Sequence, residues 1–173
     1  MTPAEAFAGK EIPEGVRTEL MLIDVPHLSF DGTLQQGQLV VHKAVADEVQ
    51  EIFYKLLEMR FPIQQIVPIS RYGWDDNASM AANNTSAFNC RFIYGMNKLS
   101  NHSYGRAIDL NPMLNPYMQI DGVSVPPGVV YDPSKPGTVT EEIVGLFESY
   151  GWQWGGHWQE RTDYQHFEKP DPA

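Results

Sequence analysis

Two short segments of this 173-residue chain carry side chains that bind metal ions and move protons. His102 and Asp109 lie in the run SNHSYGRAID at 100–109, and His166 lies in the run DYQHFE at 163–168. Two imidazoles and one carboxylate supply the nitrogen and oxygen ligands that zinc accepts, and three protein ligands leave a fourth position open for water. The residue types therefore indicate a zinc site at His102, Asp109 and His166.

The chain around the first segment must bring its side chains to one point. A strand is expected over 107–110, and its period of two places Ala107 and Asp109 on one face. Gly105 permits the bend that returns His102 toward that face, and the small Ala107 leaves space beside the metal. Asp109 is followed by Asn-Pro, however, and could instead satisfy backbone amides in a turn.

The second segment needs a local irregularity. Asp163 and His166 are three residues apart and would point to opposite sides of a regular strand. A turn or bulge near Asp163 is therefore expected if both side chains face the same ion. A histidine in a polar loop is more often solvated or hydrogen-bonded than a ligand, so the spacing alone leaves that alternative open for His102 and His166.

Longer motifs add a resemblance. The pattern SxHxxGxAxD at 100–109 is followed by GWxWGGxW at 151–158 and DxxHF at 163–167. Together with the Phe-Asp-Gly turn at 30–32 and the stretch NNTSAFNCR at 83–91, these motifs resemble the zinc peptidases of the M15 family. The resemblance implies an α+β fold, a small antiparallel sheet with helices packed against it, as in D-alanyl-D-alanine peptidases and the hedgehog signalling domain.

The resemblance also assigns roles to residues. It implies one zinc ion per chain, held by His102, Asp109 and His166, with Asp163 as the general base. Zinc lowers the pKa of a bound water from 15.7 to about 7, and a neighbouring carboxylate can take its proton and pass it to the leaving amine. No serine or cysteine nucleophile is needed, because the metal polarises the scissile carbonyl. If Asp163 proves dispensable, Glu160 or Glu168 must be considered as the base.

M15 peptidases also use an arginine near the metal to bind substrate and stabilise the oxyanion. Arg71 follows an edge strand expected at 63–70, but in the order Ser-Arg-Tyr-Gly rather than the Ser-Gly-Tyr-Arg of many relatives. Arg91 lies nine residues before Ser100, so a single hairpin would bring its guanidinium beside the metal. We favour Arg91, although either arginine could be a surface residue or part of an ion pair. Ser100 could bind substrate or hold the His102 loop.

The last motif indicates a branch of the family. Asp-x-x-His is similar to the L-alanyl-D-glutamate endopeptidases, whereas the carboxypeptidase and dipeptidase branches more often have Glu-x-x-His. The resemblance therefore implies hydrolysis of peptidoglycan stem peptides or muropeptides, with L-alanyl-D-glutamate endopeptidase as the first choice and D-alanyl-D-alanine carboxypeptidase as the alternative. A non-catalytic zinc-bearing binding module is the rival from another class, and the presence of Asp163 argues against it.

Sequence patterns also predict the elements that position these residues. Apolar residues at helical spacing predict a helix over 42–60, closed by a proline, and a capping box predicts another over 138–151. The Asp-Gly pairs at 31–32 and 121–122 predict tight turns between extended segments. The polar stretch at 71–100 is expected to be a long loop.

Composition limits the partners. Twelve Lys and Arg against 22 Asp and Glu give a net charge of −10, which predicts no nucleic-acid partner. No apolar run approaches the roughly 20 residues of a membrane helix. Residues 1–20 show no signal peptide, so we expect a cytoplasmic protein, or a periplasmic or extracellular one if a leader was removed.

We expect a monomer, with an N-terminal extension at 1–27 packed on or leading into one zinc peptidase domain at 28–173.

Overall fold

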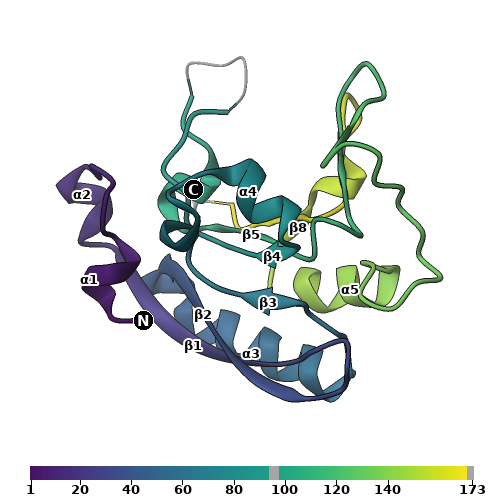
Figure 1. Ribbon diagram of the computed structural model, residues 1–173, viewed down its shortest axis with the longest axis horizontal. Coiled ribbons are helices and arrows are strands. Elements are labelled where there is room, and N and C mark those ends of the chain that lie inside the picture. Colours follow the sequence, from purple (N-terminus) through teal and green to yellow (C-terminus); the bar gives the residue numbers. More distant parts are fainter. Residues whose placement is uncertain (94–97, 171–173) are drawn as a thin grey trace.

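Helices and small sheets alternate along residues 1–93 and 98–170, which the computed structural model describes (Figure 1). The helices are α1 (Pro3–Ala6), α2 (Glu14–Arg17), α3 (Ala46–Glu58), α4 (Asp76–Ala81) and α5 (Glu141–Ser149). Short 3-10 turns lie at η1 (Lys43–Val45), η2 (Ile69–Tyr72), η3 (Asn101–Tyr104) and η4 (Gly155–His157). The strands are β1 (Leu20–Leu28), β2 (Leu34–His42), β3 (Gln65–Ile66), β4 (Asn84–Thr85), β5 (Ala107–Asp109), β6 (Tyr117–Met118), β7 (Ser124–Val125), β8 (Gln153–Trp154), β9 (Thr162–Asp163) and β10 (His166–Glu168). The α+β class predicted from the sequence is confirmed.

A long antiparallel hairpin, β1–β2, forms one side of the molecule, and α3 lies along it (Figure 1). The predicted turn at Asp31 and Gly32 joins the strands, and the Asp31 carboxylate accepts hydrogen bonds from Ser29 and Thr33. Each strand has nine residues, so the hairpin is longer than the short extended pieces expected from the sequence. One face of the two strands is buried against α3, and this burial stabilises strand pairing far beyond the Asp31-Gly32 turn that the sequence predicts.

The first 27 residues lie against the rest of the chain. Ala6 and Phe7, at the end of α1, pack with Val40 and Phe88 in an apolar cluster on the other side of the hairpin. The last residues of this segment form most of β1 and therefore belong to the hairpin itself.

A three-stranded antiparallel sheet in the order β5-β10-β8 carries the two metal-ligand motifs. Its apolar side chains join those of the hairpin, α3 and α5 in the main core, whose largest fully buried members are Phe53, Phe147, Trp152, Phe167 and Ile108. A second sheet, β7-β6-β9, contains the hairpin predicted at Asp121-Gly122 and ends in Asp163. The sheet that carries Asp109 and His166 therefore packs into the same core as α5 and the long hairpin.

Three local predictions need correction. The segment 63–70 contributes only β3, which pairs in parallel with β4, before the chain turns into η2. The polar region 71–100 is not all loop, because it contains α4, capped by the Asp75 side chain, and β4. The capping box at 138–141 is wrong: α5 has Thr140 as its N-cap, without a side-chain hydrogen bond, because the Thr138 side chain is buried instead.

Within the described residues, α3 is the longest helix, and none is long and apolar enough to cross a membrane.

Candidate metal centre and active site

The register of β5 and β10 places Asp109 directly opposite His166. These residues are 7% and 6% exposed, and the Asp109 Oδ1 lies 3.0 Å from the His166 Nδ1. Paired residues of an antiparallel sheet project from the same face, so β5 and β10 by themselves fix two of the three expected ligands. The alternative that Asp109 serves only a turn does not hold, since it ends a buried strand and faces an imidazole.

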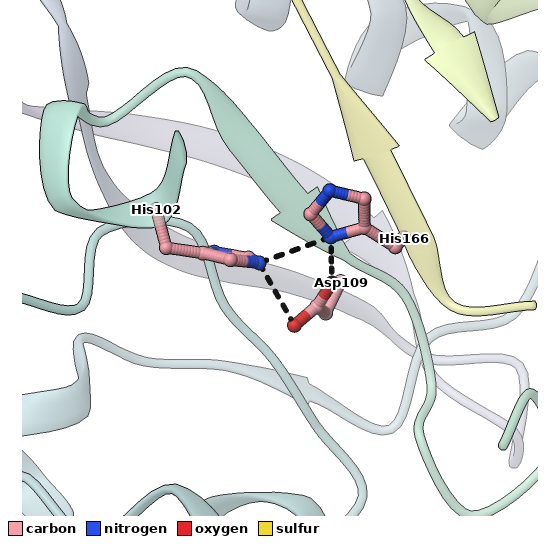
Figure 2. A group of neighbouring side chains, drawn as sticks. All are labelled: His102, Asp109 and His166. Carbon is pink, nitrogen blue, oxygen red and sulfur yellow. Dashed lines mark hydrogen bonds and ion pairs between the residues drawn. The ribbon is translucent and has the colours of Figure 1, made fainter. Parts of the chain in front are cut away.

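His102 reaches the same point from η3 (Figure 2). Ser100 caps this turn, its Oγ accepting a hydrogen bond from the His102 backbone N–H at 3.3 Å. Gly105 ends the turn with a φ of +66°, and a Cβ there would lie 2.5 Å from the backbone nitrogen of His42. The expected bend at Gly105 is therefore confirmed, and only glycine fits it. As a result the His102 Nε2 lies 3.1 Å from both the Asp109 Oδ2 and the His166 Nδ1.

The outward-facing nitrogens of both imidazoles have acceptors of their own. The His102 Nδ1 lies 2.5 Å from the backbone oxygen of Ala87, and the His166 Nε2 lies 3.1 Å from the Glu168 Oε2. Both outer nitrogens therefore donate, which leaves lone pairs on the two inner nitrogens. When both imidazoles are neutral, these lone pairs and the Asp109 carboxylate converge with no hydrogen atom between them, an arrangement that suits a bound cation.

The cluster has the dimensions of a metal site. The ligand atoms of His102, Asp109 and His166 all lie within 4.8 Å of one another and are buried. Nitrogen and oxygen ligands about 2.0–2.1 Å from a tetrahedral zinc ion are about 3.3 Å apart, close to the separations of 3.0 and 3.1 Å found here. The donor set therefore fits zinc.

The electrostatics of the cluster point the same way. Burial alone lowers the pKa of His166, but its hydrogen bonds to the carboxylates of Asp109 and Glu168 outweigh this and raise it to about 10. Burial raises the pKa of Asp109, but the charges and hydrogen bonds of His102 and His166 hold it well below its usual range. Without a metal, the site therefore keeps a proton, which a metal ion has to displace on binding.

Glu168 supports the site in a way that the sequence analysis missed. Its Oε2 accepts hydrogen bonds from the His166 Nε2 and, at 2.7 Å, from the Asn101 Nδ2. It was considered only as an alternative base, whereas it lies on the outer side of His166. The signal was available, because residues 166 and 168 share one strand face by the period of two.

Asp163 approaches the cluster through the expected irregularity. The chain bends at residues 164–165 between β9 and β10, which confirms the predicted turn. Gly155 packs tightly beneath it: a Cβ there would lie 2.8 Å from the Asp163 backbone oxygen and 3.3 Å from the His166 Cβ. The Asp163 Oδ1 is buried and has no hydrogen-bond partner among the described residues.

The surroundings of Asp163 suit a base. Burial raises its pKa to about 7; the charge of Asp109 adds to this rise, while the charges of His166 and Arg91 oppose it. A carboxylate with a pKa near the operating pH can both take up and return a proton.

The two arginines lie in different environments. After Arg91, residues 92 and 99 form an antiparallel bridge, and the Ser100 N–H donates to the Arg91 oxygen at 3.0 Å. The turn of the expected hairpin falls at 94–97, outside the described residues. Its guanidinium forms an ion pair with Asp76, with 3.1 Å between Nε and Oδ2. Arg71 is exposed on η2, which packs against α1. Of the two, Arg91 is the one whose charge reaches Asp163.

The tryptophans of the GWxWGGxW motif divide between core and site. Trp152 and Trp154 are buried, and their indole N–H groups donate to Glu48 and to the Tyr164 backbone oxygen. Trp158 is partly exposed, with its ring centroid 5.2 Å from that of His166. It is therefore the aromatic side chain of the motif that borders the metal cluster.

The structure thus contains a buried His-Asp-His cluster that could hold a metal ion, in an α+β fold. A family model described as D-alanyl-D-alanine carboxypeptidase, of the M15 peptidases, matches residues 94–169, a range that includes the cluster and Asp163. The match supports the resemblance found in the motifs: residues 94–169, which carry the cluster, are similar to the M15 peptidases. No curated protein matches the chain.

Proposed function

We propose that this protein is a zinc-dependent endopeptidase that hydrolyses the bond between L-alanine and D-glutamate in peptidoglycan stem peptides. The observation that carries zinc dependence is the convergence of two imidazole lone pairs and a carboxylate at separations of 3.0–3.1 Å. His102, Asp109 and His166 would hold one ion, leaving a fourth position for water or substrate. The ion would activate water and polarise the scissile carbonyl.

Asp163 is the general base of the proposed reaction. Its unpartnered Oδ1 accepts a proton from the attacking water and then gives that proton to the leaving amine nitrogen. A pKa raised to about 7 suits both steps. Protonation by Asp163 is needed because an amine leaves a tetrahedral carbon far more readily than its anion does.

Arg91 stabilises the negative charge that develops on the carbonyl oxygen, or binds a carboxylate of the substrate. A guanidinium does this through charge-assisted hydrogen bonds, often two in parallel. Ser100 acts by holding the His102 turn, since its Oγ accepts the His102 N–H. We give Arg71 no part in the reaction, because it is exposed on η2.

Two other functions remain as outcomes of the test. The description of the matching family favours a D-alanyl-D-alanine carboxypeptidase, which would remove the terminal D-alanine. Endopeptidase action is supported by the Asp-x-x-His form of the last motif. The buried Oδ1 of Asp163, which has no hydrogen-bond partner among the described residues, argues against a non-catalytic binding module.

Mass spectrometry of the products from a defined pentapeptide, L-Ala-D-Glu-diamino acid-D-Ala-D-Ala, separates these functions. Zinc-loaded protein should release L-alanine and leave a tetrapeptide that still ends in D-Ala-D-Ala. Release of the terminal D-alanine instead would establish the carboxypeptidase. An intact pentapeptide, with zinc bound and muropeptides also uncut, would contradict peptidase activity.

A further inference from the structure

The carboxylate of Asp76 contacts two side chains of one short stretch. Asp76 is the first residue of α4; its Oδ2 lies 3.1 Å from the Arg91 Nε, and its Oδ1 accepts a hydrogen bond from the Asn89 Nδ2 at 3.2 Å. The Nε–H is not aligned for a hydrogen bond with the carboxylate, so the contact with Arg91 is an ion pair. Asp76 therefore acts on the side chain of Arg91 and on the residue two positions before it.

The backbone of the same stretch is fastened to the His102 turn. Ser103 is buried, and its Oγ accepts the Arg91 N–H at 2.9 Å while lying 2.8 Å from the Arg91 oxygen. The Asn89 N–H donates to the backbone oxygen of His102 at 3.1 Å. These bonds fix where the Arg91 side chain begins relative to a metal ligand. They leave its direction to be set by Asp76.

The direction of the Arg91 side chain matters because the ion pair leaves the terminal nitrogens of its guanidinium free for other partners. A guanidinium has five N–H groups, and a contact at Nε leaves the four on the terminal nitrogens for other partners. The charge of Arg91 also reaches the buried Asp163. The terminal nitrogens are thus available on the side of the guanidinium away from Asp76.

Stability does not account for this pair. The side chains of Arg91 and Asp76 are 34% and 30% exposed, and ion pairs with this exposure contribute little to the free energy of unfolding. If the pair had only a structural role, breaking it would change the stability and the activity of the protein very little. The misplacement of a group that touches a reacting substrate, by contrast, can cost about 100-fold in rate.

We propose that Asp76 is a positioning residue that orients the Arg91 guanidinium toward the substrate carbonyl or carboxylate. This inference rests on the proposed function, and specifically on Arg91 as the substrate-binding arginine. Asp76 itself touches no substrate. It acts through Arg91, with Asn89 holding its second oxygen.

The chain offers a matched control. Asp75, the neighbouring residue, caps α4 by accepting the Ala78 N–H at 3.1 Å, and asparagine caps a helix as well as aspartate does. Asp75→Asn and Asp76→Asn therefore remove the same charge at adjacent positions. We expect Asp76→Asn to lower kcat/KM by about 10- to 100-fold and Asp75→Asn to change it less than about twofold, with little change of Tm in either. Equal kcat/KM values for the two variants would overturn the proposal.

A double-mutant cycle with Arg91→Lys tests whether Asp76 acts through the arginine. A lysine ammonium has no planar guanidinium to orient. In the Arg91→Lys protein, Asp76→Asn should therefore lower kcat/KM little further. Losses that multiply would show that Asp76 acts by another route and would contradict the proposal.

Nitrogen-15 relaxation of the Arg91 Nε–H in zinc-loaded protein provides a readout without catalysis. Its order parameter should fall in Asp76→Asn and stay unchanged in Asp75→Asn. An unchanged order parameter in Asp76→Asn would overturn the positioning role even if the wild-type protein cleaved no peptide. A wild-type protein that cleaves nothing, with the order parameter lowered as expected, would instead reject the proposed function and leave the orientation of Arg91 by Asp76 established.

Discussion

The His102 Nε2 and the His166 Nδ1 lie 3.1 Å apart, and each lies 3.0–3.1 Å from one oxygen of the Asp109 carboxylate. Their outer partners decide what they can bind. Because the outer nitrogens donate to Ala87 and Glu168, the inner ones are left with lone pairs. Outer partners of this kind fix the orientation of imidazoles that bind a metal ion.

Replacing Asp163 by asparagine should keep zinc bound and lower kcat by about 10²–10⁴-fold, because an amide cannot accept the proton from water. In the wild-type protein, kcat/KM should rise with pH as Asp163 loses its proton. The pKa of about 7 and the added positive charge of zinc place that rise at or below pH 7. Steady-state kinetics with zinc analysis would check both effects. Residual activity above about a tenth of the wild-type rate would direct attention to Glu160 or Glu168.

Replacing Glu168 by glutamine should weaken zinc binding by about 10- to 100-fold, since the charge that holds the outer nitrogen of His166 is lost. Competition with a fluorescent zinc chelator would measure the change. Glu160→Gln is the control, because Glu160 is an exposed carboxylate in the same region of the chain. Equal zinc affinity in the two variants would mean that Glu168 does not support the metal ligand.

The sequence predicts a cluster of His102, Asp109 and His166 because their types and spacing are local, and the structure brings these three side chains together. The acceptor of His102 could not be predicted in this way, since it is the backbone oxygen of Ala87, 15 residues away. The same holds for Asp76 and Arg91, which are 15 residues apart and meet only because α4 packs beside the segment 89–91. Backbone partners and long-range pairs leave no periodic signal.

At the scale of elements, the β5–β10 register and two glycines position the site. Gly155 lets η4 approach the bend that carries Asp163 and His166. The elements predicted well are those with strong local signals, such as α3 and the Asp121-Gly122 turn. Two-residue strands such as β4 were missed because they exist only through their partners.

Replacing Gly155 by alanine should destabilise the protein by about 1–3 kcal/mol and weaken zinc binding. The added Cβ would lie 2.8 and 2.9 Å from atoms of Asp163, and the backbone there must shift to admit it. Gly145→Ala, on the exposed face of α5, is the control, because no atom lies within 4 Å of its Cβ. It should stabilise the protein by about 0.5–1 kcal/mol. Denaturant unfolding would measure the free energy of unfolding of both variants. An unchanged value in Gly155→Ala would contradict the close packing of Gly155 against Asp163.

At the scale of the whole molecule, the three residues of the candidate metal site join distant parts of the chain. His102 and His166 are 64 residues apart and meet only in the folded state. A ligand that binds only the folded state at 100 times its Kd adds about 2.7 kcal/mol of stability. Zinc should therefore raise the Tm of metal-free protein by about 5–10 °C for a domain of this size. Calorimetry would show this, and His102→Ala should show no such rise.

The central claim is that this protein is a zinc peptidase whose ion is held by His102, Asp109 and His166. The most direct test is the rate of stem-peptide cleavage as zinc is added back to chelator-treated protein. The rate should start near zero, rise in proportion to zinc, and level off at one equivalent per chain. Cleavage that persists without metal, or that does not respond to zinc, would contradict the claim.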